Sequence, residues 1–192
     1  MVTRSAIDIS QDRSFLSPDS GLSNVFAMAV GTSFYQPCFP QSSVDLSFSS
    51  TAMHWLSSAP AAIPDALHSA CSTDPGAVAA YEAQAARDWE HIMSLREQEL
   101  KAGGQLVVVN FAVDEGGYFL GHSHRMSGSM HGTFADLWRD LVTDEEFEAT
   151  NFPNQYRSLD AQCAPFGKTV NMDLISAETM HVPCPYYDGY NQ

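Results

Sequence analysis

The feature that most constrains the fold is one long helical segment that runs directly into a strand. Asp74 followed by Pro75 is typical of a helix start, because aspartate caps free N–H groups and proline suits the first turn. Residues at helical spacing then follow: Tyr81, Ala85, Trp89 and Ile92. Gly103-Gly104 is expected to end the helix, and the β-branched run at 105–110 to form a strand. Such a pair is half of a parallel β-α-β crossover, so the chain is predicted to have an α/β fold.

Two further strands are predicted before this helix. The apolar run at 25–30, stopped by Gly31, is typical of a strand that is buried on both faces. A second strand is expected at 44–49, where apolar and polar residues alternate. The following segment, 51–57, is predicted to form a short helix. The sheet would then have three parallel strands.

The segments that leave these three strands are expected to share one edge of the sheet, where ligands of parallel sheets bind. They hold hydroxyl groups, aromatic rings and a histidine, which suits a pocket for a flat polar ligand. Phe34 or Tyr35 would stack on the ligand's ring. Ser33, His54 and the indole N–H of Trp55 would form hydrogen bonds to it. The alternative is that the aromatic side chains are part of the core.

The amino-acid composition of the chain changes after Asp114. A loop rich in Gly, Ser and His is followed by apolar residues that mark one face of a helix: Phe134, Leu137, Trp138, Leu141 and Val142. A capping box at 143–146 predicts another short helix. We therefore expect a loop or disordered segment at 1–20, an incomplete α/β core at 21–114, and a helical cap with the C-terminal segment at 115–192.

Charge and cysteine usage narrow the class of partner and the compartment. Nine basic and 23 acidic residues give a net charge of −14, which argues against nucleic acid or an anionic membrane surface as a partner. No apolar stretch is long enough to cross a bilayer, and the first twenty residues lack the apolar core of a signal peptide. The four cysteines are scattered, which is typical of free thiols in a cytoplasmic protein.

Several short motifs also follow one another in a specific order. They are Gly31-Thr32-Ser33-Phe34-Tyr35, Phe39-Pro40, Ser49-Ser50, His54-Trp55-Leu56-Ser57 and Pro60, then Trp89, 95–100, Gly103-Gly104, 137–142 and 150–156. This series resembles the SABATH family of S-adenosylmethionine-dependent carboxyl methyltransferases, which includes salicylate, jasmonate and indole-acetate methyltransferases and caffeine-pathway N-methyltransferases. The resemblance covers roughly residues 22–160. It implies a partial Rossmann-like methyltransferase sheet, its C-terminal part, with a helical cap.

The resemblance also implies roles for particular residues. The cofactor S-adenosylmethionine would contact Ser33, Phe34 and Ser50. The substrate would contact Trp55, His54, Thr51, Met130, His131 and Tyr156, with the indole of Trp55 donating to a carboxylate. Asn151 resembles a position that contacts magnesium in some members.

The reaction so implied is methyl transfer to the carboxylate of a small aromatic or hydrophobic acid. A carboxylate is already ionised at pH 7, so no general base is needed and His54 would be a hydrogen-bonding and shape residue. Relatives of this kind are often homodimers.

One part of the family pattern does not match. No strand, glycine-containing loop and acidic residue precede Val25, although these would approach the cofactor closely and hold its ribose. Three interpretations stay open: a fragment of a longer protein, a non-catalytic remnant, or a chain that a partner completes. The alternative function is thus a catalytically inactive, truncated methyltransferase-like protein that acts as a binding or dimerisation module.

A metal site is a further alternative. His122 and His124 flank one residue and, with His131, would form a small ligand cluster. No cysteine or carboxylate stands near them at ligand spacing, so we interpret them as exposed loop histidines. The acidic pairs at 114–115 and 144–146 are interpreted as a solvated loop and a helix start.

Overall fold

The computed structural model describes Gly21, residues 24–120 and residues 128–182. Its internal contacts divide the chain into two compact units, residues 1–33 and residues 34–192. Within the described part of the first unit, the backbone forms neither a helix nor a strand.

The strand predicted at 25–30 is wrong. The described sheet has two strands, neither of which includes this run, and the side chains of Phe26 and Met28 are 83% and 87% exposed. An apolar run becomes a buried strand only where a neighbouring strand pairs with its backbone groups. In the described part of the chain, the run has no such neighbour.

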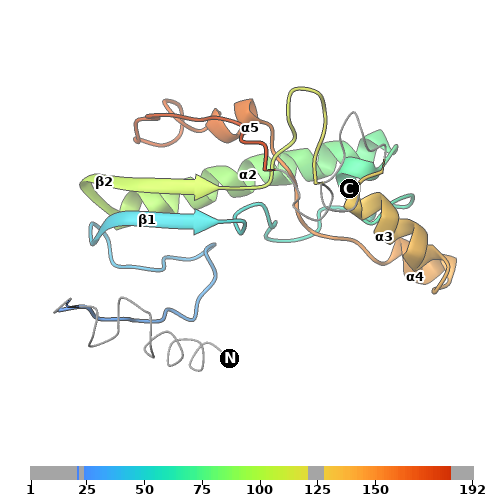
Figure 1. The fold of residues 1–192 in the computed structure, drawn as a ribbon, viewed down its shortest axis with the longest axis horizontal. Coiled ribbons are helices and arrows are strands. Elements are labelled where there is room, and N and C mark those ends of the chain that lie inside the picture. Colours follow the sequence, from blue (N-terminus) through green and yellow to red (C-terminus); the bar gives the residue numbers. More distant parts are fainter. Residues whose placement is uncertain (1–20, 22–23, 121–127, 183–192) are drawn as a thin grey trace. The chain divides into compact units, whose positions relative to one another are not determined.

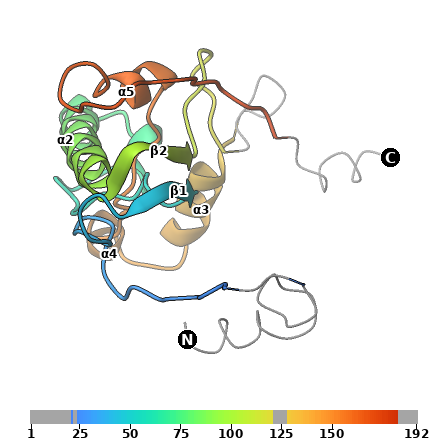
Figure 2. The ribbon, with the colours of Figure 1, turned by 90° about the vertical axis from the view of Figure 1, so that its left-hand side faces the viewer.

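The second unit is built on a parallel strand pair joined by a long helix (Figure 1). These elements are β1 (Val44–Ser50), α2 (Pro75–Glu99) and β2 (Leu100–Val109). The strands pair in parallel, from Val44 opposite Leu100 to Ser50 opposite Val109, which confirms the predicted crossover. Both arrowheads in Figure 1 point toward the end at which α3 lies, and Figure 2 shows α2 along one face of the pair.

Short helices and irregular chain make up the rest of this unit. They are the 3₁₀ helix η2 (Ser69–Cys71), α3 (Met130–Arg139), α4 (Asp144–Glu148) and α5 (Leu159–Cys163). The capping box predicted for α4 is confirmed, because Thr143 and Glu146 each accept from the other's backbone N–H. Helix α3 starts four residues before Phe134, since the Ser129 side chain caps it by accepting from Gly132 N–H.

Helix α2 begins where the sequence predicts, but it ends four residues before the predicted end at Gly103. The Asp74 carboxylate accepts from two backbone N–H groups at its start. The helix ends at Glu99, and both glycines that were expected to end it lie inside β2. Gly103 has a φ of +79°, and a Cβ on Gly104 would lie 2.9 Å from the Val44 carbonyl oxygen. Gly104 therefore allows the close approach of the two strands, and Gly103 supplies a left-handed backbone conformation inside β2, so neither glycine caps the helix.

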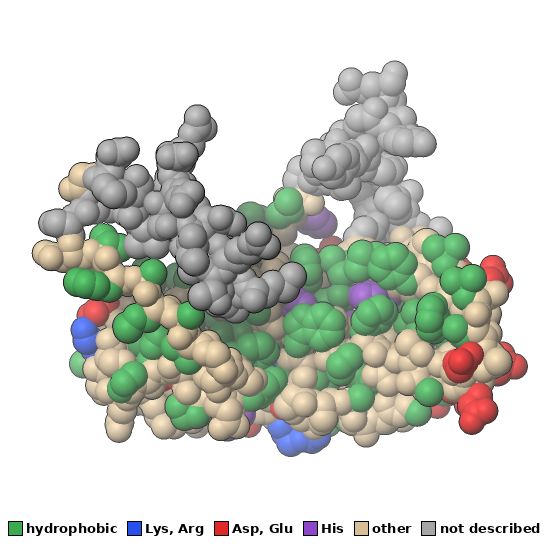
Figure 3. Space-filling model, turned by 90° about the horizontal axis from the view of Figure 1, so that it is seen from below, with side chains coloured by type: hydrophobic (Ala, Val, Ile, Leu, Met, Phe, Trp, Pro, Cys, Tyr) green, Lys and Arg blue, Asp and Glu red, His purple; other side chains and the backbone are tan. Residues whose placement is uncertain are grey.

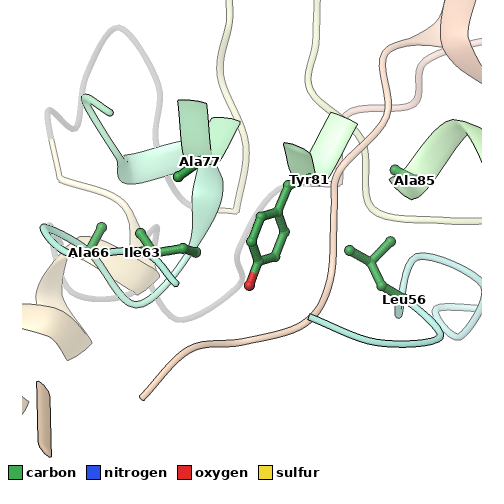
Figure 4. Packing of buried hydrophobic residues seen from close by; sticks show 6 residues of the cluster. All are labelled: Leu56, Ile63, Ala66, Ala77, Tyr81 and Ala85. Atoms are coloured by element: carbon green, nitrogen blue, oxygen red, sulfur yellow. The ribbon is translucent and has the colours of Figure 1, made fainter. Parts of the chain in front are cut away.

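The buried face of α2 carries the hydrophobic core. Figure 4 shows Tyr81 between Ile63 on one side and Leu56 on the other, within the cluster Leu56, Ile63, Ala66, Ala77, Tyr81 and Ala85. A second cluster is formed by Met53, Trp89, Ile92, Met93 and Val170. The chain that leaves β1 therefore packs directly on α2. Among the described residues, no helix is both long and apolar enough to cross a membrane.

Candidate functional site

The chain turns sharply where it leaves β1, at the carboxyl edge of the strand pair. The Thr51 N–H donates to the carbonyl oxygen of Val109 at 2.7 Å, so the ends of both strands are tied together. Thr51 has a φ of +51°, which turns the backbone away from the sheet. The short helix predicted over 51–57 is wrong, because these residues form turns whose backbone groups bond to other segments.

The next residues form a backbone clamp with the segment 153–155. The Leu56 N–H donates to Pro153 O at 2.7 Å, and the Gln155 N–H donates to His54 O at 2.9 Å. Trp55 lies between these bonds, and its carbonyl accepts from the Tyr35 hydroxyl at 2.7 Å. The indole ring is 42% exposed. Trp55 thus has a fixed backbone and a side chain at the surface.

Behind Trp55 lies a group of buried rings that we call the imidazole cluster: His54, His68, His131 and Tyr156. Their exposed fractions are 3%, 0%, 3% and 4%. The ring centroids lie 4.3 Å apart for His68 and His131, 4.7 Å for His68 and Tyr156, and 5.7 Å for His54 and Tyr156. The indole of Trp55 stacks 6.0 Å from His54, so the rings form a continuous path inward from the surface.

Phenylalanine rings border the imidazole cluster. Phe111 follows β2 and lies 5.2 Å from His54. Phe119 lies 5.9 Å from Tyr156, and Phe152 lies 5.2 Å from His131. The four rings of the cluster come from four separate segments of the chain. They form a polar centre that phenylalanine rings surround.

The hydrogen bonds of the cluster leave two ring nitrogens without partners. The Ala70 N–H donates to His68 Nδ1 at 3.0 Å, so the proton of this neutral ring is on Nε2. His131 Nε2 and the Tyr156 hydroxyl are 2.7 Å apart. Among the described residues, the buried atoms His54 Nδ1 and His131 Nδ1 form no hydrogen bond. The side chain of Asn154 forms a weak hydrogen bond with His68, which raises the pKa of His68 against the larger effect of burial.

Burial keeps the whole cluster neutral. Burial lowers the pKa of His54 to about 4, with a smaller contribution from Arg157. Burial lowers the pKa of His68 to about 3, assisted by His131, whose own pKa is lowered by burial. Burial also raises the pKa of Tyr156 to about 12. At pH 7 these groups are therefore suited to hydrogen bonding rather than to general acid–base catalysis.

A second set of buried polar residues supports the segment that carries Trp55. The Asp88 carboxylate accepts from Ser57 N and Ser57 Oγ, each at 2.8 Å, and from the Tyr35 hydroxyl at 3.2 Å. The Arg157 guanidinium donates to the carbonyl oxygens of Ala85 and Met53. Both residues are about 95% buried, so the position of the Trp55 segment is fixed by charged groups inside the core.

The predicted substrate residues form one connected set of rings and two separate, more exposed positions. Trp55, His54, His131 and Tyr156 lie in one connected set of rings. Met130 begins α3 beside His131 and is 42% exposed, and the exposed Thr51 marks the strand ends. Their contact with a substrate stays a prediction.

The predicted cofactor residues are more dispersed. Ser33 is the last residue of the first unit, and Phe34 is the first residue of the second. Phe34 packs, partly buried, against the cluster of Met53 and Trp89. The hydroxyl of Ser50 lies at the carboxyl end of β1, exposed. Phe34 and Tyr35 therefore resemble core residues, the alternative interpretation of these aromatic side chains, more than Trp55 does.

One predicted cofactor residue, Ser50, stands where parallel sheets bind ligands. The ribose of a nucleoside is commonly held by a carboxylate beyond a neighbouring strand. The pairs of residues that directly follow β1 and β2, 51–52 and 110–111, include no carboxylate. These two positions therefore do not supply the carboxylate that would hold the ribose.

Metal ligation has little support in the described residues. The Tyr81 hydroxyl donates to the Asn151 side-chain oxygen at 3.0 Å, which engages the atom expected to contact magnesium. Where the chain is described, no three His, Cys, Asp or Glu side chains are grouped to hold a metal ion. His122 and His124 lie outside the described residues. His131 stacks on His68 instead.

Sequence reasoning missed three residues that define this site: His68, Asp88 and Arg157. His68 lies in an irregular segment between two proline-containing turns, where no periodicity predicts burial. Asp88 falls on the apolar stripe of α2 beside Trp89, and a charged residue at that position is a usable signal. Arg157 directly follows Tyr156 in irregular chain and carries no comparable signal.

Comparisons with known proteins agree with the SABATH resemblance. The family model described as SAM dependent carboxyl methyltransferase matches residues 4–161. Loganic acid O-methyltransferase of Catharanthus roseus is 29% identical over 148 residues, which cover 70% of this chain and 39% of the relative. Indole-3-acetate O-methyltransferase 1 of Arabidopsis thaliana is 28% identical over 139 residues, 65% of this chain and 34% of the relative. The chain belongs to the family of SAM-dependent carboxyl methyltransferases.

A solved structure supports the fold in the same way. "Loganic acid methyltransferase with SAH" matches with a TM-score of 0.61 at 27% identity, over 76% of this chain and 44% of that chain. The predicted fold class, a partial Rossmann-like α/β structure, is confirmed. The chain spans about two fifths of the length of these relatives.

Proposed function

We propose that the protein transfers a methyl group from S-adenosylmethionine to the carboxylate of a small aromatic or hydrophobic acid. Family membership supports the reaction type. The observation that carries the proposal is the exposed indole of Trp55 beside a buried ring cluster at the carboxyl edge of two parallel strands. This arrangement offers an N–H donor at the surface and aromatic walls behind it.

The residues of the site would act by positioning. The cofactor supplies a methyl group on a positively charged sulfur. The indole N–H of Trp55 donates to one oxygen of the ionised carboxylate and leaves the other oxygen free to attack. The neutral ring of His54 orders the indole by stacking, at 6.0 Å between centroids. No protein group needs to remove a proton, because the acid is ionised at pH 7.

Replacing Trp55 by phenylalanine tests this role, because it removes the N–H and keeps an aromatic ring. A hydrogen bond to a charged group contributes about 1.5–3 kcal/mol, so kcat/KM for small acids should fall about 10- to 100-fold. The assay is transfer of a labelled methyl group to a panel of carboxylic acids. Trp138→Phe is the matched control, since Trp138 is similarly exposed, at 37%, on α3. Equal activity of the two variants would contradict the assigned role of Trp55.

The second candidate function is a non-catalytic binding or dimerisation module. Exposed apolar side chains on α3 and just beyond it favour it: Met130, Phe134, Leu137, Trp138 and Leu141. Their spacing places them on one side of a helix. Figure 3 shows hydrophobic side chains gathered across one face of the molecule. Sedimentation velocity and a thermal shift with S-adenosylhomocysteine separate the two functions, because a dimer whose melting temperature does not respond to this ligand is the module.

We also propose a cytoplasmic location. The described cysteines, Cys38, Cys71 and Cys163, are all free, and Cys184 lies outside the described residues. Scattered free thiols are typical of a reducing compartment.

A further inference from the structure

Tyr35 connects two segments for which the sequence predicts different ligands. It directly follows Phe34, a predicted cofactor residue, and the centroids of the two rings lie 4.8 Å apart. Its hydroxyl donates to the carbonyl oxygen of Trp55, a predicted substrate residue, at 2.7 Å. One side chain therefore contacts both the ring expected beside the cofactor and the backbone of the residue expected to hold the acid.

We propose that Tyr35 is a positioning residue that couples the two sides of the site: a cofactor held against Phe34 fixes the Tyr35 side chain, whose hydroxyl then fixes the backbone of Trp55. This inference rests on the proposed function. It adds that the cofactor and the acid bind cooperatively, so that each increases the affinity for the other by the same factor. Tyr35 acts through Trp55 and touches no reacting atom.

The backbone around Tyr35 is fixed to α2. The Arg96 guanidinium donates to the carbonyl oxygens of Phe34 at 3.3 Å and of Gln36 at 3.1 Å. His91 Nε2 donates to the carbonyl oxygen of Tyr35 at 3.1 Å. The side chains of Phe34 and Tyr35 are only partly buried against the second hydrophobic cluster. A ligand that packs on Phe34 would therefore restrict the two rings rather than move their backbone.

The hydroxyl of Tyr35 has one proton and two acceptors, which gives this contact two arrangements. The Trp55 carbonyl oxygen is at 2.7 Å, and Oδ2 of Asp88 is at 3.2 Å. Asp88 is the charged acceptor, but its Oδ2 also accepts from Ser57 N–H at 2.8 Å. Burial, with the negative charge of Asp88, raises the pKa of Tyr35, so the hydroxyl keeps the proton for which the two acceptors compete. The Trp55 carbonyl is held in one arrangement and released in the other.

The orientation of the indole depends on this bond because of the peptide plane that it holds. The Trp55 carbonyl and the Leu56 N–H belong to one rigid plane. The Leu56 N–H donates to Pro153 O at 2.7 Å on one side, and the Tyr35 hydroxyl holds the carbonyl on the other. Without the Tyr35 bond, the plane can rotate about its remaining anchor. The Cα next to this plane carries the indole, which is 42% exposed.

The experiment measures the coupling between the two ligands by calorimetry on the full chain. The acids tested are benzoate, phenylacetate and hexanoate, each with and without saturating S-adenosylhomocysteine. The best-binding acid should bind about fivefold or more tightly with S-adenosylhomocysteine present, and the reverse titration should give the same ratio. Tyr35→Phe keeps the ring and removes the hydroxyl. It should reduce both ratios to about one and leave the affinity for S-adenosylhomocysteine alone nearly unchanged.

Tyr81→Phe is the matched control. It also removes the hydroxyl of a tyrosine packed on α2, but this hydroxyl donates to the side chain of Asn151 rather than to Trp55. The ratio should persist in this variant. A purely structural loss would weaken binding of the acid equally with and without S-adenosylhomocysteine, so it would not change the ratio.

The indole N–H resonance of Trp55 provides a readout in the unmodified chain, and its absence from the spectrum of Trp55→Phe assigns it. S-adenosylhomocysteine alone should shift this resonance and leave that of Trp138, on α3, unchanged. An unshifted Trp55 resonance, a ratio of one in the unmodified chain, or a ratio that survives Tyr35→Phe would overturn the role of Tyr35 and leave the proposed methyltransferase function standing. Absence of binding by every acid, with S-adenosylhomocysteine bound, would overturn both.

Discussion

Removing the carboxylate of Asp88 should destabilise the protein more than any surface substitution on the same helix. Asp88 is 95% buried on α2 and accepts four hydrogen bonds. The donors are Ser57 N at 2.8 Å, Ser57 Oγ at 2.8 Å, Gln84 Nε2 at 2.9 Å and the Tyr35 hydroxyl at 3.2 Å. The carboxylate therefore joins the segments before and after β1 to the helix.

The expected magnitude follows from what Asp88→Ala would leave behind. The Ser57 N–H and hydroxyl would lose their acceptor, but Ser57 is exposed, so water replaces the carboxylate and each loss costs about 0.5–1.5 kcal/mol. The Tyr35 hydroxyl would keep its bond to the Trp55 carbonyl, so it adds little. Arg157 would also lose a favourable electrostatic interaction with Asp88, although its guanidinium keeps its bonds to the carbonyls of Ala85 and Met53. Together, these losses should lower the free energy of unfolding by about 2–3 kcal/mol.

The measurement is the free energy of unfolding in urea at pH 7. Glu90→Ala is the matched control, because it removes an exposed carboxylate from the same helix and should change the free energy by less than about 0.5 kcal/mol. Asp88→Asn keeps the shape and part of the acceptor capacity, so it should fall between the two. If Asp88→Ala behaved like Glu90→Ala, the carboxylate would not be what holds the Trp55 segment on the helix.

Two further perturbations have clear expected outcomes. Burial holds the pKa values of His54 and His68 at about 4 and about 3, below the value near 6.5 of an unfolded histidine, so the unfolded chain binds protons more readily. Stability should be complete above pH 6.5 and decrease as the pH falls toward 4, and a flat urea-unfolding profile between pH 7 and 4.5 would contradict the burial of neutral rings. Gly104→Ala should destabilise by about 1–3 kcal/mol, because its Cβ would lie 2.9 Å from the Val44 carbonyl oxygen, whereas Gly128→Ala meets no atom within 4 Å and should leave the melting temperature nearly unchanged.

The features of the fold that the sequence predicts correctly are those that neighbouring residues determine, such as the starts of helices. Asp74 and Pro75 fix the start of α2, the capping box at Thr143 fixes that of α4, and both are found as predicted. The run at 25–30 was mistaken for a strand because its apolar composition suits a buried strand. Composition alone does not determine which other strand would pair with it. The glycines at 103–104 were mistaken for a helix end, since close approach of two strands demands the same residue type as a left-handed cap.

The candidate site was less predictable, because its residues lie on irregular chain. His54 and Trp55 were identified through a motif, and the structure shows them adjacent to His131 and Tyr156. His68 is brought there by hydrogen bonds that its neighbours make with distant residues, such as Phe152 N–H to Leu67 O at 2.8 Å. Pairings of this kind have no period, so no local pattern in the sequence could have found them.

The position of the site therefore depends on the charged residues of α2 more than on its apolar ones. Apolar packing is not directional, so it holds irregular chain against a helix without fixing where each residue lies. Arg96 and Glu99 are both buried, form an ion pair at 2.8 Å, and bond to backbone groups of the segment 34–39. Asp88, about two turns nearer the start of the helix, does the same for the backbone of Ser57. Because a buried charge that loses its partners is strongly destabilising, neither segment can slide without a large penalty. A site whose chemistry consists of positioning two reactants needs that restriction, and three charged residues on one helix provide it.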